Sequence, residues 1–132
     1  MSALETVGKI YAAFGRGDVG GILEQLSENV EWEYGATAND VPWLQARRGR
    51  AGAGAFFASL AGMEIHHFAV KALLGEGVLV IGLVDIEFTV RATGRRLREE
   101  DEIHIWQFDQ AGHVSRFRHR VDTLAQQRAV AP

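Results

Sequence analysis

The chain of 132 residues contains no cysteine, which excludes disulfides, thiolate metal sites and cysteine nucleophiles. It has two prolines against fifteen glycines, and this balance indicates tight turns rather than stiff linkers. No run of about 18 apolar residues is present, so we expect no membrane-spanning helix. The first residues lack the basic and apolar pattern of a secretory leader, and we therefore expect a cytoplasmic protein with no membrane partner.

Neither charge sign dominates the composition. The formal net charge of −3 and the 23% of charged residues argue against nucleic acid as a partner. Hydrophobic residues make up 47% of the chain, which is typical of a globular protein. The length fits one domain over residues 1–132 that buries roughly two thirds of its unfolded surface.

Helical spacing dominates the first part of the chain. Ser2 and Glu5 form a capping-box pattern, and apolar residues then recur at helical spacing as far as Phe14. Asp18 is placed to cap a second helix, and a third is expected over residues 50–61.

Alternating patterns indicate strands elsewhere. In residues 29–34, Trp32 and Tyr34 alternate with Glu31 and Glu33, so we expect the aromatic side chains to point inward and the acids outward. Four longer strands are expected over residues 63–74, 78–91, 96–108 and 113–121. Asp122 can cap a last helix, while residues 126–132 resemble a frayed tail. Helices followed by a meander predict an α+β fold, a curved antiparallel sheet packed on three N-terminal helices.

The last predicted hairpin places ionisable side chains on one sheet face. If Phe108 pairs with His113, then His104 faces Phe117 and Glu102 faces His119. Trp106 shares that face, since side chains alternate along a strand. Buried acids and imidazoles are costly unless they are paired, so this cluster is the candidate site.

The preceding hairpin decides where Asp85 lies. A turn of two or four residues puts Asp85 opposite Glu102, whereas a turn of three residues moves it to the other face. The first register leaves an apolar band of Val80, Val84, Ile86 and Phe88 on the outer face. Such a band predicts a homodimer through the sheet.

These residues suggest general acid and base chemistry. Glu102 can orient His119 as a base, while His104 and Asp85 can donate hydrogen bonds or protons to a substrate oxygen. The same residues can equally form satisfied structural pairs, and Tyr34 can line the cavity rim or belong to the core. Histidines and carboxylates also suit a metal, but we expect neither metal nor cofactor. Trp43 is expected in a loop at the pocket mouth. The expected pocket lining consists of Tyr34, Trp32, Trp43, Phe57, Trp106, Phe117 and Tyr11.

Six segments, in order and spacing, resemble the SnoaL-like branch of the nuclear transport factor 2-like superfamily. That superfamily includes ketosteroid isomerase, limonene-epoxide hydrolase and polyketide cyclases. The resemblance implies a cone-shaped sheet around the helices, an internal apolar pocket and dimerisation through the sheet. The matching segments are residues 11–18, 29–32, 48–57, 90–94, 104–106 and 116–122.

The resemblance also relates particular residues to known sites. Compared with ketosteroid isomerase, Tyr34 stands at the base position, His104 at the protonated-acid position, and Tyr11 beside the tyrosine position. Compared with the epoxide hydrolase, Asp85 stands at the position of one of its aspartates, and His119 stands at the position of a second. The resemblance implies a cofactor-free isomerase, cyclase or hydrolase for a small apolar, oxygen-bearing substrate. A non-catalytic small-molecule binding module is the alternative, as is a dimeric interaction protein whose pocket is filled by its own side chains.

Overall fold

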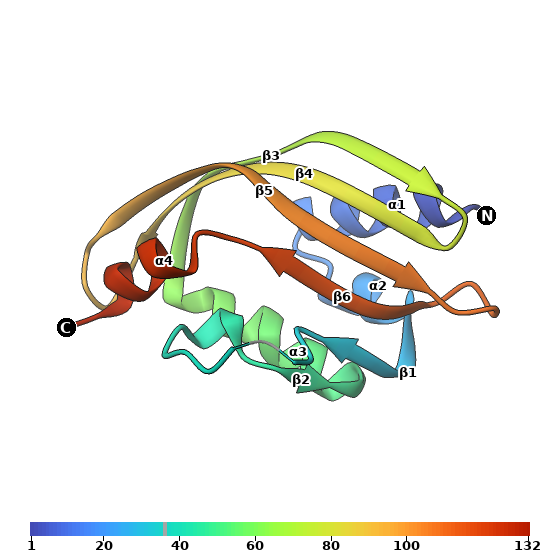
Figure 1. Cartoon of the computed structure of the whole chain (residues 1–132), viewed down its shortest axis with the longest axis horizontal. Coiled ribbons are helices and arrows are strands. Elements are labelled where there is room, and N and C mark those ends of the chain that lie inside the picture. Colours follow the sequence, from blue (N-terminus) through green and yellow to red (C-terminus); the bar gives the residue numbers. More distant parts are fainter. Residues whose placement is uncertain (36) are drawn as a thin grey trace.

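The computed structural model describes residues 1–35 and 37–132, and within them six strands form one sheet (Figure 1). The strand order is β2-β1-β6-β5-β4-β3, with β1 and β6 parallel and the other neighbours antiparallel. The α+β fold is confirmed. The elements are α1 (Ala3–Gly15), α2 (Val19–Leu23), β1 (Leu26–Trp32), η1 (Pro42–Leu44), β2 (Arg47–Arg48), α3 (Gly49–Ser59), η2 (Leu60–Gly62), β3 (Met63–Glu76), β4 (Leu79–Val90), β5 (Arg96–Phe108), β6 (Val114–Arg120) and α4 (Thr123–Val130).

Side-chain caps begin three of the helices. Ser2 Oγ accepts from the Glu5 backbone N–H at 3.1 Å, and Asp18 Oδ1 accepts from the N–H of Gly21 at 2.9 Å. Asp122 caps α4 through the N–H of Ala125 at 3.0 Å. The expectation of a frayed tail from residue 126 is wrong, because α4 continues to Val130.

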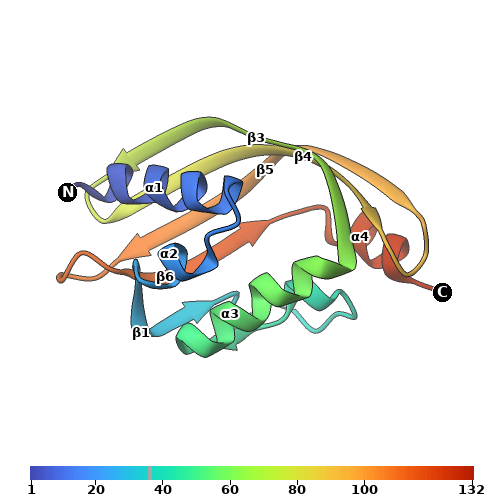
Figure 2. The same ribbon diagram turned by 180° about the vertical axis from the view of Figure 1, so that it is seen from behind.

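The sheet curves around the helices, which lie on its concave side (Figure 2). Helix α1 packs against β3 and β4, and α3 packs against β1. Helix α4 contacts β5 at the far end of the molecule, near the C-terminus (Figure 1). The space between sheet and helices is filled largely by aromatic rings, and Trp32 stacks on Phe117 with ring centroids 4.3 Å apart.

A β-bulge in β5 overturns the predicted position of Asp85. Ile86 pairs with Glu99 and Val84 pairs with Glu102. Between these two pairs β5 advances by three residues and β4 by two, so β5 contains one extra residue. Asp101, in the bulge, adopts a positive φ of 62°. Consequently Val84 and Ile86 point inward, and Asp85 between them points to the outer face.

The partners predicted for β5 and β6 are also shifted. His104 pairs with His119, and Trp106 pairs with Phe117. Phe108 pairs with Val114 instead of His113, which moves the partners by one position, and the register shift between Gln107 and Phe108 moves them by one more. Alternation therefore still keeps the predicted side chains on the inner face, but Glu102 does not lie opposite His119.

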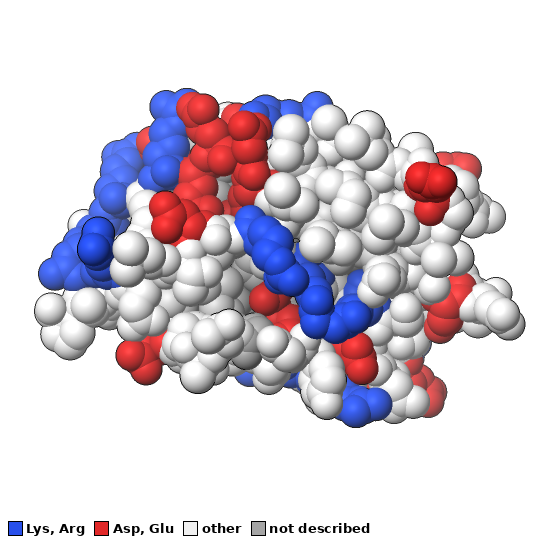
Figure 3. Space-filling view, viewed as in Figure 1, with Lys and Arg blue, Asp and Glu red and all other residues white. Residues whose placement is uncertain are grey.

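The outer face carries a different apolar band from the predicted one. Val80, Val84, Ile86 and Phe88 are buried inside, whereas the outer face of β4 and β5 carries Leu79, Ile81, Leu83, Ile103 and Ile105. Figure 3 shows this face, with an uncharged area beside a charged cluster, and basic side chains following β6. No helix within residues 1–35 and 37–132 is long and apolar enough to cross a bilayer.

Candidate functional site

A cavity of about 80 Å³ lies between the concave face of the sheet and the helices. Its wall is mostly aromatic, and its polar part is formed by Glu102, His104, His119 and Gln126. Six of the seven residues predicted to line a pocket do so. They are Trp32, Trp43, Phe57, Trp106, Phe117 and Tyr11. The seventh, Tyr34, is 47% exposed and does not line the cavity.

Glu33, which the alternation pattern placed outside, is buried at the site. Its φ of 55° lies in the left-handed region and breaks the alternation of β1, so that Glu33 turns inward and Tyr34 turns out. Glu33 Oε1 accepts from the backbone N–H of His119 and lies 3.1 Å from its Nδ1. The nearby Gly35, also at positive φ, is the one sequence signal that the regular strand ends here.

Glu33 and His119 form a buried ion pair. Burial alone would raise the pKa of Glu33, but the contacts with His119 outweigh it and lower that pKa. Burial alone would lower the pKa of His119, and the neighbouring Glu33 carboxylate raises it above 6.5. The pair therefore favours the imidazolium form of His119. Among the described residues, Nδ1 contacts Glu33 as an ion pair without hydrogen-bond geometry, and Nε2 forms no hydrogen bond.

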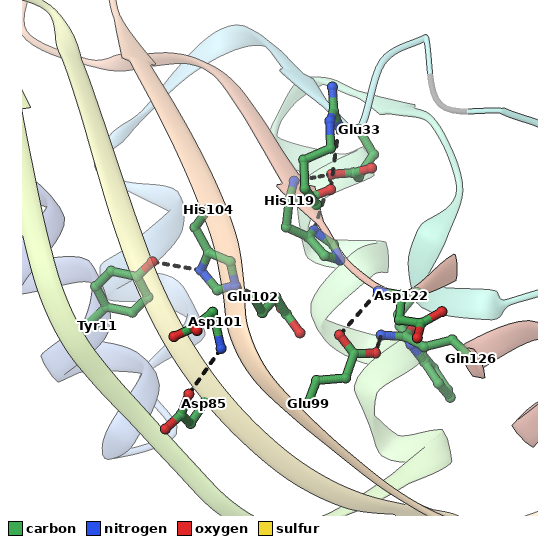
Figure 4. A network of polar contacts seen from close by, with 12 residues as sticks. Tyr11, Glu33, Asp85, Glu99, Asp101, Glu102, His104, His119, Asp122 and Gln126 are labelled. Carbon is green, nitrogen blue, oxygen red and sulfur yellow. Dashed lines mark hydrogen bonds and ion pairs between the residues drawn. The ribbon is translucent and has the colours of Figure 1, made fainter. Parts of the chain in front are cut away.

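A second buried imidazole, His104, belongs to a hydrogen-bonded chain (Figure 4). Its Nδ1 lies 2.6 Å from the Tyr11 hydroxyl, and its Nε2 lies 2.9 Å from Glu102 Oε1. The Tyr11 oxygen accepts from Trp106 Nε1 at 3.1 Å. The oriented imidazole beside Glu102 is thus His104, and the predicted Glu102–His119 pair is wrong.

The electrostatics of this chain favour a neutral His104. Complete burial lowers the pKa of His104 below 6.5, although Glu102 acts in the opposite direction. Burial raises the pKa of Tyr11, so its hydroxyl stays protonated. The two imidazoles lie close together, with ring centroids 5.8 Å apart, yet their environments favour opposite protonation states.

Asp85 takes no part in the cavity. Its carboxylate lies 2.9 Å from Lys71 Nζ and accepts from the backbone N–H of Asp101 at 3.0 Å. The hydrogen bond from Lys71 lowers the pKa of Asp85. Lys71 also pairs with the Asp101 carboxylate, so Asp85 belongs to a charged group on the outer face.

A further buried polar cluster closes the end of the cavity near α4. Gln126 Nε2 donates to Glu99 Oε1 at 2.8 Å, and Gln126 Oε1 accepts from Trp43 Nε1 at 2.7 Å. Burial raises the pKa of Glu99, and the Gln126 amide partly opposes that shift. Sequence patterns missed this cluster because Glu99 turns inward only through the bulge, and Gln126 falls in the segment expected to fray.

The described residues contain no group of three or more histidine, aspartate or glutamate side chains arranged to hold a metal ion. The site instead consists of two imidazoles, each paired with its own carboxylate, at one wall of an aromatic cavity. This arrangement can accept a proton at a carboxylate and donate a hydrogen bond from an imidazolium.

Comparison with known families agrees with the fold. A family model described as a SnoaL-like domain matches residues 7–117. The chain belongs to the SnoaL-like family. No curated protein matches this SnoaL-like chain.

Solved structures similar to this SnoaL-like chain share its fold over nearly the whole length. An NTF2-like protein from Burkholderia thailandensis is 25% identical, with a TM-score of 0.83 over 100% of this chain and 99% of that one. One from Burkholderia xenovorans is 24% identical, with a TM-score of 0.81 over 98% and 95%. TerC, crystallised with polyporic acid, is 24% identical, with a TM-score of 0.71 over 96% of each chain. Other matching structures are named as candidate polyketide cyclases or isomerases.

Proposed function

We propose that this SnoaL-like protein is a cofactor-free enzyme that moves a proton within a small, mostly apolar substrate carrying a carbonyl oxygen. The observation that carries the proposal is the pair of buried imidazoles on one cavity wall, each beside its own carboxylate. Burial lowers the pKa of His104, whereas the Glu33 carboxylate raises the pKa of His119. Environments that shift the pKa values of two neighbouring titratable groups in opposite directions are typical of acid and base pairs in catalysis.

Each group has a role that follows from its contacts. The Glu102 carboxylate takes a proton from the carbon next to the carbonyl, and His104 holds that carboxylate in place from Nε2. The electrons move to the carbonyl oxygen, forming an enolate. His119 Nε2–H donates a hydrogen bond to this oxygen, while Glu33 keeps the imidazole charged and oriented. In a β,γ-unsaturated ketone the enolate is conjugated with the carbon–carbon double bond, and return of the proton from Glu102 to the γ-carbon completes an isomerisation that moves this double bond.

The apolar lining of the cavity supports this chemistry. Its wall is formed mainly by aromatic and aliphatic side chains, among them Trp32, Phe57 and Trp106. Electrostatic interactions are stronger in such a low-dielectric site, so one imidazolium can stabilise an enolate well. The small volume favours a compact substrate or the reactive end of a longer one.

The test is deuterium exchange of acidic C–H groups, followed by NMR in D₂O over a panel of cyclic ketones and enones. We expect Glu102→Gln to slow exchange by about 10² to 10⁴ fold, because it removes the base. Glu100→Gln is the matched control, since Glu100 lies on the same strand but outside, paired with Arg98 at 3.1 Å. It should retain the rate within about twofold.

Two results would overturn the proposal. One is full exchange activity in Glu102→Gln. The other is binding of panel compounds by the wild-type protein without any exchange above the buffer rate. The second result would favour the non-catalytic binding module, whose ligand would occupy the same aromatic cavity.

A further inference from the structure

A glycine in the middle of β4 lies directly against the Tyr11 hydroxyl. Gly82 pairs with His104 across the β4–β5 ladder. A Cβ atom placed on Gly82 would lie 2.6 Å from Tyr11 Oη and 3.4 Å from its Cζ. The first distance is far below van der Waals contact, so any larger residue at this position would displace the hydroxyl.

Backbone conformation does not explain this glycine. Gly82 has no left-handed φ, and it lies within a regular stretch of the ladder. Its inward-facing neighbours on β4, Val80 and Val84, are β-branched and fully buried, as strand positions favour. Glycine in a strand interior weakens the strand and often marks a close approach of another group. Here that group is the phenol of Tyr11.

The Tyr11 hydroxyl and the Glu102 carboxylate each bind one ring nitrogen of His104. The indole of Trp106 can only donate, so the Tyr11 oxygen accepts from it at 3.1 Å. The hydroxyl then donates its own hydrogen to His104 Nδ1, 2.6 Å away. Because Nδ1 accepts, the neutral imidazole carries its proton on Nε2 and donates it to Glu102.

We propose that Gly82 is a positioning residue of the site: its missing side chain leaves room for the Tyr11 hydroxyl, which donates to His104 Nδ1 and holds the imidazole with its Nε2–H directed at Glu102. Its effect on catalysis rests on the proposed function, whereas its effect on the hydrogen bond to His104 Nδ1 does not. The structure also predicts which second substitution relieves the clash. Removing the hydroxyl leaves the Tyr11 ring carbon at 3.4 Å and Leu73 Cδ2 at 3.5 Å from the new Cβ, both tolerable contacts.

The experiment compares the wild-type protein with Gly82→Ala, Tyr11→Phe and the double variant. The nitrogen-15 NMR chemical shift of His104 Nδ1 reports in each protein whether this nitrogen accepts a hydrogen bond. We expect the shift of a hydrogen-bonded Nδ1 in the wild type and its loss in both single variants. The double variant should match Tyr11→Phe. Gly8→Ala is the control on α1, since nothing lies within 4 Å of its added Cβ, and it should leave the Nδ1 shift unchanged.

Exchange activity gives a second readout of the same coupling. Gly82→Ala should lower the rate about tenfold or more in the wild-type background and less than twofold in the Tyr11→Phe background. Equal effects in the two backgrounds would overturn the proposal, as would an unchanged His104 Nδ1 shift in Gly82→Ala. If Gly82→Ala does not fold, recovery of folding in the double variant supports the proposal, and failure of both to fold contradicts it.

The outcomes separate this proposal from the proposed function. A His104 Nδ1 shift that responds as expected, in a protein that exchanges no substrate, would leave Gly82 as a positioning residue of a binding site. Exchange that requires Glu102 but ignores the Gly82 and Tyr11 substitutions would support the enzyme and contradict the role of Gly82.

Discussion

Replacing Glu33 by glutamine should destabilise the protein in a pH-dependent way. The pKa of Glu33 is lower in the folded protein than its ordinary value of 4.5. Its contribution to stability is therefore present above pH 4.5 and is lost as the pH falls through the folded-state pKa. The raised pKa of His119 means that its contribution is present below 6.5 and disappears as pH rises through the folded-state value. The pair therefore contributes fully between pH 4.5 and 6.5.

The expected magnitude follows from the burial of both groups. Removing one partner of a buried ion pair costs about 3–5 kcal/mol when the other stays charged. His119 can instead lose its proton, which at pH 5.5, one unit below 6.5, costs about 1.4 kcal/mol. Glutamine can still accept from the backbone N–H of His119. We therefore expect Glu33→Gln to lower the free energy of unfolding by about 2 kcal/mol at pH 5.5. At pH 8.5 the loss should be smaller, at about 1 kcal/mol or less.

Urea unfolding of both proteins at several pH values measures this difference. Glu31→Gln is the control, because Glu31 lies two residues earlier on the same strand, half-buried, 3.5 Å from Arg116. Such a pair contributes less than about 1 kcal/mol, with little change between pH 5.5 and 8.5. A loss for Glu33→Gln that is the same at both pH values would refute the reasoning.

Three further outcomes follow from residues away from this pair. Asp85→Asn should keep exchange activity within about twofold, as measured by the NMR assay, because Asp85 faces outward; a large loss would contradict its placement. Gln126→Leu should lower the free energy of unfolding by about 1–3 kcal/mol, since the Trp43 indole and Glu99 lose a buried partner; wild-type stability would contradict this cluster. We also propose that the outer face of the sheet forms a homodimer, so light scattering should find Ile103→Glu monomeric where the wild-type protein is dimeric; a monomeric wild type would contradict it.

Alternation along β5 was sufficient to predict the polar face of the cavity. Glu102, His104 and Trp106 share one face because the strand is regular between them, and β6 adds Phe117 and His119. A register shift of two residues between β5 and β6 changes which residues pair but leaves each side chain on the same face of the sheet. The sequence therefore predicts the members of this cluster better than their partners.

Two of the errors arise at non-glycine residues with positive φ. Asp101 lies in the bulge of β5, where the alternation of inward and outward side chains changes by one residue. This change places Glu99 inside and Asp85 outside. Glu33 ends the regular alternation of β1 and brings in the carboxylate that charges His119. Left-handed acidic residues depend on tertiary contacts such as the bond from His119, so local propensity does not predict them.

The most direct test of the acid and base assignment is an NMR titration of His104 and His119 in the wild-type protein. The account predicts a pKa below 6.5 for His104 and above 6.5 for His119. In Glu33→Gln, the pKa of His119 should fall because its carboxylate partner is gone. Two histidines that titrate together near 6.5, or in the reverse order, would contradict the central claim.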